Sequence, residues 1–229
     1  MTQPTIGVLM LETRFPRPVG DIGNPDTWSF PVRYAVVSAA TAPRVVSRDP
    51  VGAALFERFL AAARDLIEEG AAAITTSCGF LSPLQEELSA SLPVPVATSS
   101  LLLVAEAQGS LPAGQRVGVI TIDAAALTAH HLEAAGVPAD TPIVGVEGGR
   151  ELHRVIMNDL PTLDLAAARA DVLAAGDALK DREPNLGAVV LECTNMPPYS
   201  DALADHLGLP VYDAVTLVDR LARRCAVNE

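Results

Sequence analysis

Two of the three cysteines in this 229-residue chain stand in similar settings. Cys78 lies in the segment TTSCGF (75–80) and Cys193 in LECTNM (191–196), each after an apolar run and among small polar residues. A thiol has a reference pKa of about 8.5, which falls near a helix N-terminus. Two such thiols on opposite sides of one carbon could remove a proton from one face and return one to the other. That exchange racemises the carbon and needs no cofactor in principle.

The two cysteines also share the sequence that follows them, at a constant offset of 115 residues (193 − 78). Pro83 corresponds to Pro198, and the Pro-Val pair at 95–96 corresponds to the pair at 210–211. Near the start of each half, GVLML (6–10) and GVITI (118–122) match at an offset of 112 (118 − 6). Self-similarity of this kind indicates a duplicated structural unit. We therefore predict two copies of one α/β unit, one in each half of the chain.

Apolar runs alternate with segments of helical periodicity, which predicts an α/β fold with mainly parallel sheets flanked by helices. We expect two pseudo-symmetric lobes with the active site in the cleft between them: an N-terminal lobe of residues 1–100 plus 213–229, and a C-terminal lobe of residues 101–212. The expected strands are 5–11, 33–39, 71–77, 94–99, 116–122, 142–147, 186–192 and 210–214. The expected helices are 50–70, 81–92, 100–108, 124–136, 150–180 with a break near Pro161, 197–208 and 215–225.

Polar groups suited to a carboxylate gather around the two cysteines. Ligands of parallel sheets bind beyond the carboxyl ends of the strands, and each cysteine directly follows a predicted strand, so both are expected to face one cleft. Hydroxyls, a side-chain amide and backbone N–H groups can hold a carboxylate there and stabilise enolate charge. The candidate catalytic residues are Cys78 and Cys193, and the candidate substrate-binding residues are Ser77, Gly79, Thr121, Thr194 and Asn195.

The overall charge argues against several classes of partner. Lysine and arginine number 16 and aspartate and glutamate 28, which gives a formal net charge of −12 and disfavours nucleic acid and anionic membranes. No apolar run reaches the ~20 residues of a membrane span, and no signal peptide is evident. The cysteines and histidines lack zinc-site spacing, so we expect no metal and no cofactor. Reduced thiols and the absence of an export signal predict a cytoplasmic protein, which we expect to be a homo-oligomer.

The motifs SCGF and ECTNMPPY, together with VGVITI at the start of the second half, resemble the aspartate/glutamate racemase superfamily. That superfamily also includes hydantoin racemases, maleate isomerases and arylmalonate decarboxylases. The resemblance covers most of the chain and implies that the family's paired catalytic cysteines are Cys78 and Cys193, and that its following threonine is Thr194. Two departures stand out: Gly79-Phe80 replaces the usual Asn-Thr, and Asn195 replaces His or Glu. The CGF and ECT…PPYSD pattern is also similar to the algal dimethylsulfoniopropionate lyases of this superfamily.

The leading hypothesis is a cofactor-independent racemase or epimerase that acts at the α-carbon of a small amino acid or related carboxylate. The alternative is a lyase that eliminates from a β-substituted carboxylate such as dimethylsulfoniopropionate. A third hypothesis is a two-lobed binding protein for small molecules, in which the cysteines are inert. Cys225, on the last predicted helix, is interpreted as a packing residue.

Four further residues admit two interpretations each. Glu192 could tune the neighbouring thiol or contact an amino group, or it could be a satisfied structural carboxylate. Arg14 and Arg17 lie on a long loop (12–31) that could cover the cleft. They could bind a second substrate carboxylate or simply be exposed to solvent. Tyr199 could line the pocket or pack at a helix start.

Overall fold

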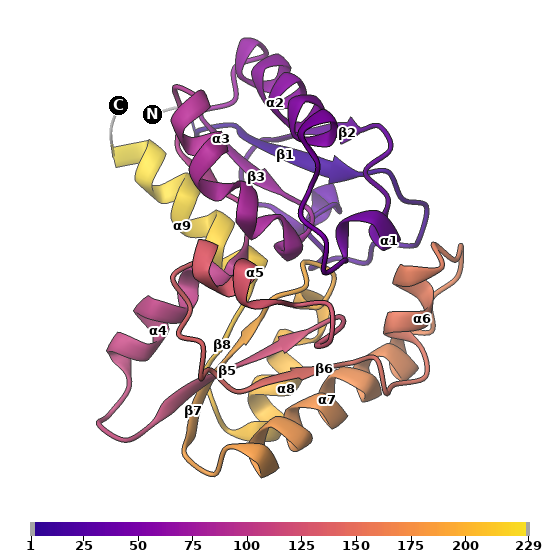
Figure 1. Ribbon diagram of the computed structural model, residues 1–229, viewed down its shortest axis with the longest axis vertical. Helices are drawn as coiled ribbons and strands as arrows, with labels where there is room; N and C mark the ends of the chain where they lie inside the picture. The colour runs from indigo at the N-terminus through magenta and orange to yellow at the C-terminus, as the bar shows by residue number, and fades with distance from the viewer. Residues whose placement is uncertain (1–2, 228–229) are drawn as a thin grey trace.

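The computed structural model describes residues 3–227 and contains two four-stranded parallel sheets, one for each half of the chain (Figure 1). The first sheet has the strand order β2-β1-β3-β4 and the second the order β6-β5-β7-β8, so both follow the same topology, as the internal repeat predicts. The α/β fold class with two similar lobes is therefore confirmed. The strands are β1 (Ile6–Leu11), β2 (Val32–Val37), β3 (Ala73–Thr76), β4 (Val96–Ala97), β5 (Arg116–Thr121), β6 (Ile143–Gly145), β7 (Leu186–Leu191) and β8 (Val211–Tyr212).

The first sheet is covered by helices on both faces, and β1 shows how the sequence produces this. Successive side chains of a strand point to opposite faces. Leu9 packs in the core that also contains residues of α2 (Ala53–Glu68), whereas Val8 packs in the core that contains residues of α9 (Ala214–Val227). The C-terminal helix thus returns to the first sheet, where it lies beside β3 and β4 (Figure 1). The lobe boundaries, 1–100 plus 213–229 and 101–212, stay a prediction.

The helices lie where periodicity predicts them, but several are shorter. The helix expected at 81–92 begins as a 3-10 turn, η2 (Gly79–Leu84), and the one expected at 197–208 begins as η4 (Pro197–Tyr199). Both turns contain proline, which lacks an N–H group and restricts the residue before it. The remaining elements are η1 (Pro25–Thr27), α1 (Ala42–Val45), α3 (Gln85–Ser91), η3 (Ser100–Leu103), α4 (Val104–Ser110), α5 (Ala129–Ala134), α6 (Leu152–Met157), α7 (Leu165–Arg182) and α8 (Ser200–Leu207).

Buried hydrogen bonds join the two halves close to the cysteines. The Thr194 hydroxyl donates to the Ser77 carbonyl oxygen at 2.6 Å, and the Ser100 hydroxyl donates to the Leu191 carbonyl oxygen at 2.6 Å. Ser77 follows β3 and Thr194 follows β7, so the bond between them links the carboxyl ends of two corresponding strands. At the rim, α6 of the second half approaches α1 of the first (Figure 1). The candidate site is therefore assembled from both halves.

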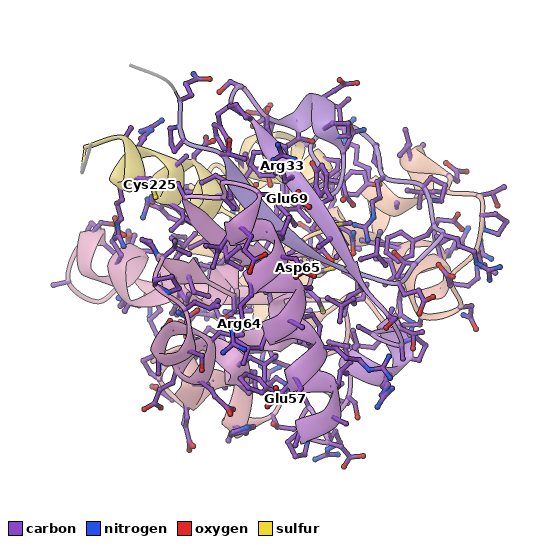
Figure 2. All side chains as sticks on the ribbon, turned by 90° about the horizontal axis from the view of Figure 1, so that it is seen from above. Arg33, Glu57, Arg64, Asp65, Glu69 and Cys225 are labelled. Atoms are coloured by element: carbon purple, nitrogen blue, oxygen red, sulfur yellow. The ribbon has the colours of Figure 1, made fainter. Side chains whose placement is uncertain are left out.

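The outer surface of the first lobe is charged. Figure 2 shows Glu57, Arg64 and Asp65 on α2, where all three are exposed. Arg33 of β2 pairs with Glu69 at 3.1 Å across this surface. Within residues 3–227, no helix has both the length and the apolar character that crossing a membrane would require.

Candidate active site

Cys78 and Cys193 line one cavity, to which both halves of the chain contribute. Both side chains are buried, and each follows a central strand of its own sheet, β3 or β7. The cavity is narrow, because its volume of about 10 Å³ is close to the least that holds one water molecule. The walls therefore lie close together. They are formed by Leu11, Phe15, Arg17, Ala42, Val46, Ser77, Cys78, Gly79, Phe80, Ile122, Ile156, Glu192, Cys193, Thr194 and Asn195.

Each thiol receives a hydrogen bond from the backbone N–H two positions further along the chain. Phe80 supplies this N–H for Cys78, and Asn195 supplies it for Cys193. Such donors favour the thiolate. Burial, and then the negative charge of Glu192, act in the opposite direction, and together they raise the pKa of both thiols above the ordinary value. Both thiols therefore favour the protonated form at neutral pH, and the charge of Glu192 adds to the effect of burial.

Glu192 is fully buried in the cavity wall, directly before Cys193. Its Oε2 accepts hydrogen bonds from the Thr121 hydroxyl, at 2.8 Å, and from the backbone N–H of Ile122, whereas Oε1 has no partner. Burial raises the pKa of Glu192 from 4.5 to about 7, because these hydrogen bonds compensate only part of the lost hydration. The interpretation of Glu192 as a satisfied structural carboxylate is therefore wrong for one of its two oxygens.

Gly79 packs directly against Glu192. A Cβ atom at position 79 would overlap both the carboxylate oxygen Oε1 and the carbonyl oxygen of Glu192. An asparagine at this position, as in the amino-acid racemases that the sequence resembles, would collide with both atoms. The departure from Asn-Thr to Gly79-Phe80 thus has a steric reason in this chain: the buried glutamate occupies the space.

A buried polar network joins Cys193 to the first loop. The Cys193 thiol donates to Asn195 Oδ1 at 3.6 Å, and the Asn195 amide donates to Asp21 Oδ2 at 2.7 Å. Arg17 pairs with Asp21 Oδ1 at 2.8 Å. Asp21 could not be recognised from the sequence, because it lies in a glycine-containing loop 174 positions from Asn195, and no local pattern marks it as buried. A thiol that donates to an amide oxygen holds its proton, so this network favours the protonated form of Cys193.

The structure brings four of the five predicted substrate-binding residues to the cavity. Ser77, Gly79, Thr194 and Asn195 line it, together with both cysteines. The hydroxyls of Ser77 and Thr194 already take part in internal hydrogen bonds, with the Leu11 N–H and the Ser77 carbonyl respectively. Thr121 does not line the cavity; it lies behind Glu192, to which it donates. The catalytic and substrate-binding roles of all these residues stay predictions.

The two loop arginines differ in their surroundings. Arg17 lines the cavity with a side chain only 13% exposed, and its guanidinium lies 4.6 Å from the centre of the Phe15 ring. Arg14 is 84% exposed and pairs with Asp159 at 3.0 Å. The interpretation of these arginines as solvent-exposed loop residues therefore holds for Arg14 and is wrong for Arg17. Tyr199 is buried and is not among the cavity-lining residues, so it packs.

Comparison with known proteins identifies the family. A model of the Asp/Glu/hydantoin racemase family matches residues 32–222. The chain is 27% identical over 225 residues to a dimethylsulfoniopropionate lyase from Durusdinium sp. clade D, and 29% identical over 225 residues to dimethylsulfoniopropionate lyase 5 from Emiliania huxleyi. These alignments cover 96% and 94% of this chain, but 74% and 44% of the two relatives. The chain therefore spans only part of their lengths.

Solved structures share the fold at lower identity. Arylmalonate decarboxylase superposes with a TM-score of 0.60 and 18% identity, over 97% of this chain and 92% of that one. A glutamate racemase from Bacillus anthracis superposes with a TM-score of 0.61 and 17% identity, over 99% of this chain and 82% of that one. At these identities the likeness extends to the fold alone.

Replacing Gly79 by alanine is expected to destabilise the protein by about 1–3 kcal/mol, because the new methyl group must displace Glu192. The free energy of unfolding, obtained by urea denaturation, measures this loss. Gly52→Ala is the matched control, since a Cβ at position 52 meets nothing within 4 Å. Equal stabilities of Gly79→Ala and the wild-type protein would contradict the close contact between Gly79 and Glu192.

Replacing Glu192 by glutamine is expected to remove a pH-dependent loss of stability. The carboxyl titrates near 4.5 when unfolded and near 7 when folded, so between these values the unfolded state binds fewer protons and stability falls as the pH rises. Each unit of difference corresponds to about 1.4 kcal/mol. Urea denaturation at about pH 5 and about pH 8 should therefore show that the free energy of unfolding falls more between these two pH values in the wild-type protein than in Glu192→Gln. Equal losses would argue against a buried, ionisable Glu192.

Proposed function

The chain belongs to the Asp/Glu/hydantoin racemase family, and on this basis we propose that it is a cofactor-independent enzyme that acts at the α-carbon of a small carboxylate. In this proposal Cys78 and Cys193 exchange protons with that carbon. One observation carries the proposal: both thiols line the same cavity, from corresponding strands of the two sheets, and each receives a backbone N–H at its sulfur. Known relatives and structural neighbours include lyases, racemases and decarboxylases.

The surroundings of the two thiols suggest different roles for them. The positive charge of Arg17 favours the thiolate of Cys78, although burial and Glu192 outweigh it. Cys193 instead donates to Asn195, and the nearby charge of Asp21 also disfavours its thiolate. We assign Cys78 as the base that takes the α-proton and Cys193 as the acid. Backbone N–H groups and the Ser77 hydroxyl, which accepts from the Leu11 N–H and can still donate its proton, would hold the substrate carboxylate and stabilise the enolate.

Elimination of a β-substituent is the outcome that we favour. The thiolate takes the α-proton, the electron pair of that C–H bond forms a double bond between the α- and β-carbons, and the bond to the β-substituent breaks. From dimethylsulfoniopropionate this releases neutral dimethyl sulfide and leaves acrylate. The lyase names of the relatives support this outcome, as do the apolar walls of Leu11, Phe15 and Ile156, against which methyl groups can pack.

Racemisation, the leading hypothesis from the sequence, stays the second candidate. In it the opposing thiol returns a proton to the other face of the same carbon. Its support is the matched pair of thiols on one cavity. Aspartate and glutamate are poorer candidates as substrates, because a second carboxylate needs a cation. Arg17, the one arginine among the described residues of the cavity wall, already pairs with Asp21.

Proton NMR in deuterium oxide tests the proposal on dimethylsulfoniopropionate and on a panel of amino acids and small carboxylates. Elimination produces vinyl proton signals, whereas racemisation replaces the α-proton by deuterium without cleavage. Cys78→Ala is expected to lower the rate at least about 100-fold, the usual contribution of a general base. Cys225 lies outside the cavity, so Cys225→Ala should keep the wild-type rate. An undiminished rate in the Cys78→Ala, Cys193→Ala double variant would overturn the proposed chemistry.

A further inference from the structure

A buried carboxylate oxygen without a partner is the unexplained feature of the cavity. Among the buried side-chain nitrogen and oxygen atoms of the described chain, only Glu192 Oε1 and His153 Nε2 lack a hydrogen-bond partner. His153 Nε2 nevertheless lies 3.5 Å from Asp123 Oδ2, which can pair with it. Leaving a polar atom buried and unpaired costs free energy, so each such atom calls for an explanation. Because Glu192 lines the cavity that both candidate thiols share, the simplest explanation is a ligand group.

We propose that Glu192 binds a positively charged group of the substrate, of the ammonium or sulfonium class. This inference rests on the proposed function, because the same cavity must also hold the substrate's carboxylate and its reacting carbon. Glu192 lines the cavity, and its Oε1 lies against Gly79, which lines the cavity too. The missing side chain at position 79 leaves room for this oxygen.

The balance of charge in the cavity favours a cationic ligand over a neutral one. After burial, the charge of Glu192 is the largest influence that raises the pKa of both Cys78 and Cys193. A carboxylate and a thiolate so close together, away from water, oppose each other's ionisation. A cation placed beside Glu192 offsets its charge. A cationic substrate would thus help to form the thiolate that takes its α-proton, whereas a neutral analogue would not.

Asp21, the other buried acid of the site, is already satisfied. Its Oδ1 accepts from Arg17 and from the Gly23 backbone N–H, each at 2.8 Å, and its Oδ2 accepts from the Asn195 amide at 2.7 Å. The charge of Asp21 is balanced by Arg17. Among the described residues of the cavity wall and this network, Glu192 is therefore the acid with an oxygen left to bind a cation.

Isosteric probe pairs test this inference without any turnover. The first pair is 3-(dimethylammonio)propionate and the uncharged-tail 4-methylpentanoate, which differ in charge at the β-position. The second pair is alanine and 2-methylpropanoate, which differ in charge at the α-position. Isothermal titration calorimetry at about pH 8, where Glu192 is ionised, gives the affinity of the full chain for each probe. The pair that shows a preference locates the cation on the substrate.

The wild-type protein is expected to bind the cationic member of one pair about 10- to 100-fold more tightly, the range of a hydrogen bond to a charged group. Glu192→Gln, which keeps the shape and removes the charge, should abolish the preference. Glu57→Gln makes the same change on the exposed face of α2 and should retain it (Figure 2). Equal affinities in both pairs, tighter binding of the uncharged-tail members, no binding of any probe, or a preference that survives in Glu192→Gln would each overturn the inference.

The binding test of the cation site and the NMR test of the proposed function can fail independently of each other. A preference for the cationic probe that Glu192→Gln abolishes, together with no reaction in the NMR panel, would support the cation site and refute the chemistry. Elimination or α-proton exchange by a protein that binds both members of each pair equally would support the chemistry and refute the cation site.

Discussion

Burial of three ionisable side chains around one cavity is the constraint on which the proposed chemistry depends. Cys78, Cys193 and Glu192 share this space, and burial is the largest influence favouring the neutral form of each. The cavity therefore disfavours more than one negative charge. Because the backbone N–H groups near the sulfurs do not outweigh burial, the proposed thiolate needs a further positive charge, which the proposed cationic substrate would supply. This constraint connects the recognition of a substrate to the activation of the base.

The duplicated scaffold supplies two similar thiols, and the first loop makes them different. Each cysteine follows a central strand of its sheet and receives the N–H of the residue two positions on. Among the described residues, however, the Asn195–Asp21–Arg17 network is hydrogen-bonded to Cys193 and not to Cys78, which receives only the charge of Arg17. Asp159 fixes the same loop by accepting from the backbone N–H groups of Arg14 and Phe15. Symmetry thus comes from the repeat, and the proposed division into base and acid from the loop.

Much of the scaffold could be predicted from the sequence, because the signals are local or repeated. Apolar runs gave the strands, and the offset between Cys78 and Cys193 gave the common topology of the two sheets. The buried position of Asp21 and the place of Thr121 behind Glu192 could not be predicted in this way. The place of Thr121 depends on Glu192, 71 positions away in the same half, which the pairing of β5 with β7 brings beside it. The burial of Asp21 depends on Asn195, 174 positions away, which the packing of the two halves brings to it. The same packing decides that Arg17 is buried while Arg14, three positions earlier, is exposed.

The central claim is that both thiols face one ligand, and cysteine alkylation followed by peptide mass spectrometry tests it most directly. The protein is treated with iodoacetamide with and without 3-(dimethylammonio)propionate, and Cys225, which lies outside the cavity, serves as the internal reference. The account predicts that this compound slows the labelling of Cys78 and Cys193 together and leaves Cys225 unchanged. Protection of only one of the two cavity thiols, or equal protection of all three cysteines, would contradict it.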